Sequence, residues 1–464
     1  MIFNPEFRRN VWVQFTWPKL LAAPLVTIIV TYAFLIVKNN DYRLLQNIAE
    51  LIGAVIVGLW GTRRAADALA EEVSGGTWES QRMSGLGAWQ MTWGKLIGSA
   101  GFVWYCAAMT MIVIFWAASR IEAVGGIARP GLQVAFEFIV GGLMAQSVAF
   151  VIALLLLRKA AQHRRLTITL AQSCGFLLFF FLVRGGFLQH SPGLMQQDSA
   201  DWAVGDRSWY GQIYSTRTVL NVTIACGCFW AVLGAYRLMR TELQYRSLPW
   251  VWLLFMLCVS VSVAGFDPWP QLGLVFLALV LLTYLSFFAD NRDPVRYRWA
   301  LLAIPEGDWL QVISAIPWWL ISYLLAAALG FAIAANLSAG GGILPPQGEV
   351  TPFAGMLWMA QQHMAGSLIL VMLFMLRDLL ILLWFSCSPW RAKADVAGII
   401  YLALIYWPLA ALLWVTDEQR LLPVVVPIAT GVPAVDYVPI GIELAFALFL
   451  FYARWREITR LKRR

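Results

Sequence analysis

The sequence contains twelve apolar runs, each close to the length that crosses a lipid bilayer. About twenty apolar residues span the hydrocarbon core as a helix, which satisfies every backbone hydrogen bond internally. The chain is 60% hydrophobic and 13% charged, whereas soluble domains are roughly half apolar and about a quarter charged. We therefore expect an all-α polytopic membrane protein. The predicted cores are 20–37, 46–62, 96–118, 132–157, 166–183, 218–236, 249–265, 271–288, 315–335, 362–386, 395–415 and 437–454.

Basic residues are distributed unevenly over the segments that join these runs. With the N-terminus placed in the cytoplasm, 25 of the 34 Lys and Arg residues fall on the cytoplasmic side and eight on the other. Lys and Arg concentrate in cytoplasmic loops. The sequence therefore predicts a multi-pass protein of the bacterial inner membrane with both termini in the cytoplasm. The same bias explains the net charge of +8, so the expected surroundings are membrane lipid, and nucleic acid is not an expected partner.

The order of charged and apolar segments repeats once along the chain. Each half opens with a charged stretch that ends in proline, FRRNVWVQFTWPKLL in one case and YRLMRTELQYRSLPWVWLL in the other. Two runs, a charged segment, two more runs, a short basic turn and two final runs follow in each. An even number of spans per half makes such a repeat parallel. We therefore predict two six-span units, residues 1–240 and 241–464, that form a pseudo-dimer with a translocation path between them.

The polar segment Arg63–Lys95 lies between the second and third runs. Its first part, up to Glu72, is rich in strong helix formers, and Gly75 and Gly76 then break the helix. Thr77 is placed to cap a second, short helix that has an acidic residue in its first turn. We expect a short cytoplasmic helix between two membrane helices, joined to them by flexible segments. A soluble partner could bind such an element and move the spans through it.

This order resembles the membrane subunits of the ABC-2 family, the permeases of one class of ATP-binding-cassette exporters. Their segment between spans two and three carries an acidic pair, Gly-Thr, a short amphipathic stretch and Gly-Lys. The resemblance covers roughly residues 4–238 and implies that the segment is a coupling helix that enters a groove on a nucleotide-binding subunit. The matching positions are Glu71, Glu72, Gly76, Thr77, Glu79, Arg82, Gly94 and Lys95.

The second half departs from this pattern. Its charged segment, Ala289–Gln311, has neither Gly-Thr nor Gly-Lys. Its place in the repeat still makes it the candidate second coupling segment. The alternative for both segments is a solvated loop that only connects two spans. The marks of the second segment are Arg292, Asp293, Arg298 and Pro305.

The chain lacks a phosphate-binding loop of its own. The nearest approach, from Gly87 to Lys95, has six residues between the glycines and Leu96 in place of the hydroxyl residue that holds magnesium. The cysteines and histidines show no metal-site spacing. We therefore expect that the chain is not itself an enzyme and binds no cofactor or metal. ATP and magnesium are expected in a separate ATPase subunit, present in two copies.

Charged residues within the predicted spans are candidates for a substrate path, because charge in lipid is costly. We expect the three glutamates among them near the outer leaflet. Arg377 and Asp378 are adjacent, so we expect them to pair with other spans rather than with each other. The alternative is a structural contact between helices or a charge near the headgroups. The candidates are Glu50, Glu137, Arg377, Asp378 and Glu443.

Two other functions remain open on the sequence alone. One is a secondary transporter with twelve spans, driven by an ion gradient. The other is a polytopic membrane transferase, for which the candidate acid–base residues are His190, Asp198, Asp201 and Asp206. These lie in the outside segment 185–214, which could equally dock an extracytoplasmic partner or be an ordinary loop.

Overall fold

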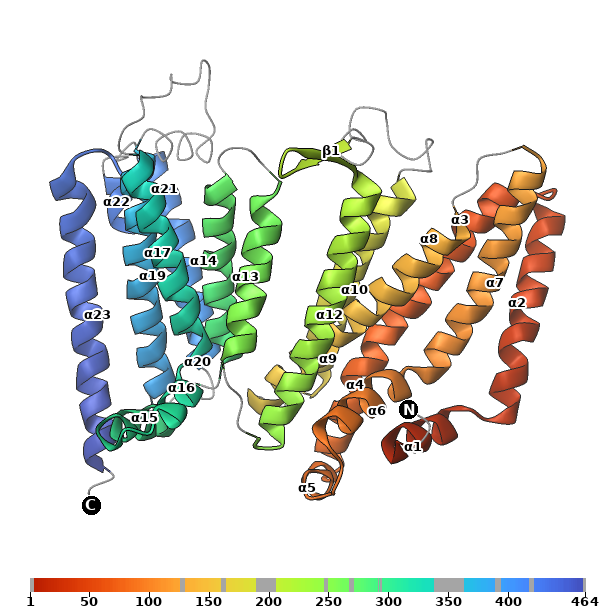
Figure 1. Cartoon of the computed structure of the whole chain (residues 1–464), viewed down its shortest axis with the longest axis horizontal. Helices are drawn as coiled ribbons and strands as arrows, with labels where there is room; N and C mark the ends of the chain where they lie inside the picture. The colour runs from red at the N-terminus through yellow and green to blue at the C-terminus, as the bar shows by residue number, and fades with distance from the viewer. Residues whose placement is uncertain are drawn as a thin grey trace, which may run out of the picture. The chain divides into compact units, whose positions relative to one another are not determined.

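The structure is a computed structural model, and almost every described residue lies in a helix (Figure 1). Contacts divide the chain into two compact units, one of Met1–Ser208 with Gln212–Ser247 and one of Trp209–Gly211 with Leu248–Arg464. The division lies close to the boundary predicted at residue 240. The described residues are 4–125, 130–159, 164–188, 206–245, 249–266, 271–290, 292, 294–337, 363–388, 394–416 and 421–461.

Unit 1 holds the helices up to α12, and η marks a π-helical stretch. Its helices are α1 (Pro5–Gln14), α2 (Trp17–Val37), α3 (Tyr42–Ala54), η1 (Val55–Trp60), α4 (Gly61–Ser74), α5 (Trp78–Arg82), α6 (Ala88–Ser99), α7 (Gly101–Ala123), α8 (Gly131–Phe136), η2 (Glu137–Gly141), α9 (Gly142–Lys159), α10 (Arg164–Leu188) and α12 (Thr216–Glu242). Two short strands, β1 (Asp206–Trp209) and β2 (Gln212–Ser215), pair with each other before α12.

Unit 2 holds the remaining helices. They are α13 (Trp250–Ala264), α14 (Gln271–Ala289), α15 (Pro294–Glu306), α16 (Trp309–Ala315), α17 (Trp318–Leu337), α19 (Met364–Cys387), α20 (Ala394–Leu404), η6 (Ile405–Leu409), α21 (Ala410–Val415), α22 (Leu422–Val425) and α23 (Pro433–Leu461). Its core lies where α14, α17 and α19 meet, around Phe276, Ala326 and Met372.

Nine helical stretches of the described chain are long and apolar enough to cross a membrane. The predicted multi-pass, all-α character is thus confirmed. Three further apolar helices, Arg165–Phe181, Trp250–Ala264 and Gly273–Ala289, coincide with predicted cores but are shorter. The 15 residues of α13, for example, extend about 22 Å, less than the roughly 30 Å of a hydrocarbon core. Twelve crossings therefore stay a prediction.

The second predicted core, 46–62, belongs to a much longer helix. The helical stretch Tyr42–Val73 has 32 residues and extends about 48 Å, well beyond the bilayer core. A π-helical turn frees backbone carbonyls, which need other partners. Gln146 of α9 donates to the carbonyl of Val57 at 3.4 Å, and Gln172 of α10 donates to that of Leu59 at 3.1 Å. The first part of the polar segment is therefore the rigid continuation of a membrane helix.

In unit 1, α1, α5 and α6 gather at the end of the bundle where α2 begins (Figure 1). The helix α6 precedes α7 and is separated from it by a break at Ala100, where φ is −96° and ψ is 8°. The third predicted core, 96–118, therefore started too early, because its first residues belong to α6. This end of unit 1 carries most of the predicted coupling residues.

Candidate functional site

The centre of this end of unit 1 is Lys95, a side chain that is 1% exposed. Its ammonium donates to Glu6 Oε1 of α1 at 3.3 Å, to Gln81 Oε1 of α5 at 2.8 Å, and to the carboxylate of Glu72 in α4. The Trp78 ring lies 5.7 Å from the same ammonium. A charge can be buried at this depth only with such partners. Lys95 therefore joins four helices at one point.

A second cation completes this group. Arg9 Nη2 donates to Glu6 Oε1 and to Glu72 Oε1, both at 2.8 Å. Gln81 Nε2 also donates to Glu72 Oε1 at 2.8 Å. Two carboxylates thus balance two cations, which limits the electrostatic cost of burial. We call Glu6, Arg9, Glu72, Gln81 and Lys95 the Lys95 cluster.

The helix α1 lies close against α6 through a ladder of side-chain amides. Asn10 Nδ2 donates to the Gly94 carbonyl at 3.1 Å, and Gln14 Nε2 donates to the Gly98 carbonyl at 2.9 Å. A Cβ atom at Gly94 would lie 2.7 Å from Glu6 Cβ, so glycine is needed for this approach. The function of Gly94 in the fold is thus to let α1 reach α6. The four-residue spacing of Asn10 and Gln14 is the sequence pattern that could have indicated this contact.

The stretch between α4 and α6, residues 75–87, turns outward, and we call it the tip. Gly76 has a φ of +67°, so the predicted glycine break is confirmed. Thr77 stands at the N-cap position of α5, but the predicted cap is wrong because its hydroxyl donates back to the Glu72 carbonyl at 3.3 Å. The Glu79 side chain is 72% exposed and pairs with Arg82 at 3.1 Å, and Met83 is 83% exposed.

The predicted coupling residues therefore separate into two groups. Glu72, Gly94 and Lys95 are buried and bind other parts of unit 1, so a soluble partner could not touch them directly. Glu71, Gly76, Thr77 and Glu79 are exposed, and Arg82 is half-buried beside Glu79. Most of the exposed predicted coupling residues therefore lie in the tip, and the Lys95 cluster holds the tip against α1, α4 and α6.

Two of the intramembrane carboxylates lie in unit 1 and are buried. Gln46 Nε2 donates to Glu50 Oε1 at 3.3 Å within α3, and Gln133 Nε2 donates to Glu137 Oε1 at 3.0 Å. Each glutamate thus accepts from a glutamine one turn earlier. That Gln-x-x-x-Glu spacing is visible in the sequence and favours a structural role for both carboxylates. Glu443 belongs to unit 2.

In unit 2, Arg377 and Asp378 lie in the middle of α19 and are almost fully buried. Arg377 Nη2 donates to Asp378 Oδ1 at 2.8 Å, so the prediction that these neighbours would not pair is wrong. The long guanidinium side chain can fold back over its neighbour's short carboxylate. Arg377 Nη1 donates to the carboxylate of Glu443 in α23, so Arg377 also pairs with another predicted span, as expected.

Three tyrosines complete this second group. The hydroxyl of Tyr284 donates to Asp378 Oδ2 at 2.9 Å, and that of Tyr406 donates to the same oxygen at 2.7 Å. Tyr401 donates to Asp378 Oδ1 at 3.4 Å. The resulting Arg377 cluster consists of Tyr284, Arg377, Asp378, Tyr401, Tyr406 and Glu443. It ties α14, α20, η6 and α23 to α19.

The second predicted coupling segment forms α15 and α16. Arg292 precedes α15, and its side chain is 8% exposed because it binds Asp395 of α20 and donates to Ser386 Oγ at 3.0 Å. Arg298 lines a pocket of about 280 Å³ beside Trp455 of α23. Pro305 lies inside α15. Asp293 falls outside the described residues.

The outside segment is only partly described. His190, Asp198 and Asp201 lie outside the described residues, and for Asp206 the backbone alone is described, as the start of β1. The candidate transferase residues therefore stay a prediction. Among the described residues, no group of His, Cys, Asp and Glu could hold a metal ion.

Comparisons with known proteins add nothing to this geometry. No protein-family model, no curated protein and no solved structure matches the chain. What the findings establish is a multi-pass helical membrane protein with two compact units.

Proposed function

We propose that this chain is the membrane permease subunit of an ATP-binding-cassette transporter, which couples ATP hydrolysis in a separate subunit to export or to an envelope process. The observation that carries the proposal is the construction of the polar segment in unit 1. The exposed tip is held by the buried, charge-balanced Lys95 cluster, and Glu72 of that cluster lies on the continuation of a membrane helix. A loop that only connected two spans would not need such a cluster.

The proposed mechanism follows the path from tip to membrane. Gln81 of α5 hydrogen-bonds to both Glu72 and Lys95, so a displacement of α5 would be transmitted to these two residues. Glu72 lies at the end of the helix that runs without interruption from Tyr42. Lys95 lies in α6, directly before α7. Movement of the tip would therefore shift the second and third membrane helices together, with α1 clamped to them.

The tip offers a small mixed surface to a partner. Met83 supplies an exposed apolar side chain, and Glu79 supplies an exposed carboxylate. Residues of this kind fit a groove that has an apolar floor and basic groups at its rim. The proposed partner is an ATPase subunit with such a groove, and it would supply the ATP and magnesium chemistry.

The test is ATP hydrolysis by the complex purified from native membranes through a tag on this chain. Met83→Asp places a charge on the apolar contact and should lower the associated ATPase activity about tenfold or more. Val124→Asp is the matched control, because Val124 is also 83% exposed but lies at the far end of α7. The proposal fails if no ATPase activity accompanies the wild-type chain, or if both variants reduce it equally.

A second candidate function is transport driven by an ion gradient. The observation that favours it is the Arg377 cluster, which places one guanidinium beside two carboxylates inside unit 2. Buried ionisable groups within membrane helices commonly mark ion or proton pathways. Gradient-driven uptake of a labelled small molecule into liposomes that contain this chain alone would establish it, provided that Asp378→Asn abolishes the uptake.

A further inference from the structure

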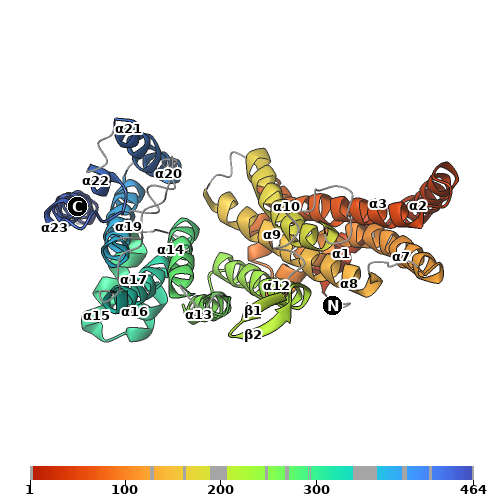
Figure 2. The same cartoon turned by 90° about the horizontal axis from the view of Figure 1, so that it is seen from above.

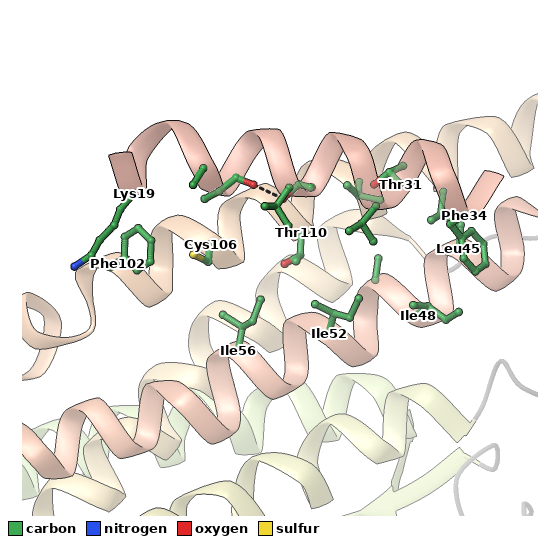
Figure 3. A pocket seen from close by; sticks show the side chains of 17 residues that line it. Lys19, Thr31, Phe34, Leu45, Ile48, Ile52, Ile56, Phe102, Cys106 and Thr110 are labelled. Atoms are coloured by element: carbon green, nitrogen blue, oxygen red, sulfur yellow. Dashed lines mark hydrogen bonds between the residues drawn. The ribbon is translucent and has the colours of Figure 1, made fainter. Parts of the chain in front are cut away.

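The helix α2 lines an open pocket of about 510 Å³ in unit 1, the size of a small-molecule site. Figure 3 shows Lys19 and Phe102 at one end of this pocket and Phe34 and Leu45 at the other. The side chains come from α2, from α3 with η1, and from α7. We call it the α2 groove, and it is lined along α2 from Lys19 to Phe34 and on the facing wall by residues that include Ile52 of α3 and Phe102 of α7.

The helix α2 contributes one regular face to the groove. Its lining residues recur every three or four positions from Lys19 to Phe34, which is the spacing of a stripe that normally packs against neighbouring helices. No residue in the apolar window of α2 is buried, although the same window of the next helical stretch is 44% buried. Figure 2 shows α2 at the margin of unit 1, beside α3 and α7. The stripe is therefore separated from α3 and α7 by an open gap and does not pack closely against them.

Both ends of α2 are held by contacts or a tight turn, so the groove does not result from an unattached helix. At the start, Phe15 meets Phe102 and Tyr105 edge-on, each with ring centroids 6.0 Å apart. The Tyr105 hydroxyl donates to the Leu20 carbonyl at 2.8 Å. At the other end, a tight turn leads into α3, with Asn39 and Asn40 both at positive φ. Between these anchors the groove extends about 22 Å along α2.

The walls of the groove are mostly apolar, with one charge and three threonines. The hydroxyl of Thr27 donates to the Ala23 carbonyl and that of Thr110 to the Ala107 carbonyl, both at 2.8 Å. Their polar atoms are thus satisfied within their own helices. Lys19 is the one charged residue among the described residues that line the groove, and its ammonium has no partner among the described side chains.

These features select the chemistry of an occupant. An apolar space does not hold ordered water, and an empty one forfeits dispersion contacts on every wall. Hydrocarbon from the surrounding bilayer can fill it, because the groove runs along a membrane helix and is longer than one leaflet of about 15 Å. Lys19 stands at the start of that helix, where headgroups lie, and a lysine there attracts anionic lipid.

We propose that the α2 groove binds one anionic glycerophospholipid, with an acyl chain between α2 and the α3–α7 wall and its phosphate group at Lys19. The lipid completes the packing of α2 onto unit 1. This site is independent of the proposed transport function, since it involves neither the tip nor the Lys95 cluster.

Native mass spectrometry of the full-length chain, released from bilayers of equal phosphatidylglycerol and phosphatidylcholine, tests the proposal. The wild type should retain one phosphatidylglycerol in preference to phosphatidylcholine. Lys19→Gln should lower that preference about fivefold, the size expected for one interfacial lysine. Lys38→Gln is the matched control, because Lys38 caps the other end of α2, is exposed and does not line the groove.

A second pair of variants tests the acyl chain. Ala22→Trp fills the groove from an exposed position on α2 and should abolish retention of both lipids. Ala33→Trp, on the same helix but outside the lining, should retain them. The proposal is overturned if Ala22→Trp keeps its lipid, if Lys19→Gln and Lys38→Gln lose preference equally, or if lipid-free dimers show that a second copy covers the groove.

Discussion

Both units bury a basic side chain among carboxylates, but they assemble it from different parts of the chain. The Lys95 cluster draws on α1, α4, α5 and α6, short or terminal segments at one end of unit 1. The Arg377 cluster is centred on two adjacent residues in the middle of the most buried membrane helix of the described chain. The Lys95 cluster joins the ends of helices, whereas the Arg377 cluster holds membrane helices side by side.

The charge balance differs as well. The Lys95 cluster has two cations and two carboxylates, and its Arg9 side chain is still 52% exposed. The Arg377 cluster has one cation and two carboxylates, with Asp378 completely buried. Arg9 can leave its partners at modest cost because it is half-exposed, whereas the buried pairs Lys95–Glu72 and Arg377–Asp378 cannot lose a partner without a large penalty. The difference makes the Arg9 contacts the ones that exchange most readily.

The two predicted coupling segments expose different kinds of side chains. The tip exposes Thr77, Glu79 and Ser80 beside one apolar residue, Met83. In contrast, α15 and α16 expose large apolar side chains, namely Trp299, Leu301, Leu302, Ile304, Trp309 and Leu310. Exposed tryptophans and leucines on short helices at a bundle end are typical of segments that lie in the headgroup layer. The first-half segment is therefore better suited to a soluble partner.

The largest effect is expected from Arg377→Met. This change leaves Asp378 and Glu443 without their cation, which costs about 3–5 kcal/mol of folding free energy for a buried pair. Thermal unfolding of the purified chain in detergent would measure it. Arg456→Met, on an exposed arginine of α23, should leave the unfolding temperature nearly unchanged. Similar losses for both arginines would mean that the Arg377 cluster does not hold unit 2 together.

A smaller and more local effect is expected from Lys95→Met. Glu6 and Glu72 keep Arg9 as a partner, so the cost should stay below that of Arg377→Met, at about 2–3 kcal/mol. Hydrogen exchange should show α1 losing protection first, while α19 keeps it. Removing the charge of Glu72 as well, in Glu72→Gln with Lys95→Met, should recover part of the loss. Uniform loss of protection across both units would contradict the junction described here.

Gly94→Ala should cost about 1–3 kcal/mol, because its Cβ would collide with Glu6 of α1. Gly234→Ala is the matched control, a helical glycine of α12 with no atom within 4 Å of an added Cβ. That control should be neutral or slightly stabilising, as alanine favours helix. Equal unfolding temperatures for the two variants would show that α1 does not depend on close approach to α6.

The smallest effect on the fold is expected from Glu79→Gln. An exposed ion pair such as Glu79–Arg82 is worth at most about 1 kcal/mol. Its unfolding temperature should therefore match the wild type, while the associated ATPase activity falls if the tip docks a partner. A loss of stability comparable to that of Gly94→Ala would instead show that Glu79 supports the fold together with the Lys95 cluster.

Sequence reasoning could predict the helices, because apolar length alone identifies membrane segments. It also predicted the glycine break at Gly76 and the acidic first turn of α5. It could not predict that Lys95 and Glu72 point inward, since burial depends on α1 returning from 89 residues away along the chain. Helix faces alone do not predict the Arg377–Asp378 pair, because they leave out the reach of a long guanidinium side chain.

We propose the tip, rather than α15 and α16, as the main contact for an ATPase. A photoreactive amino acid placed at Met83 or at Trp309 in the full-length chain tests it directly in native membranes. Both side chains are well exposed, at 83% and 63%. We expect a cross-link from position 83 to an ATPase subunit and a clearly weaker one from position 309. Cross-linking that is equal at the two positions, stronger at 309, or absent at 83 would contradict it.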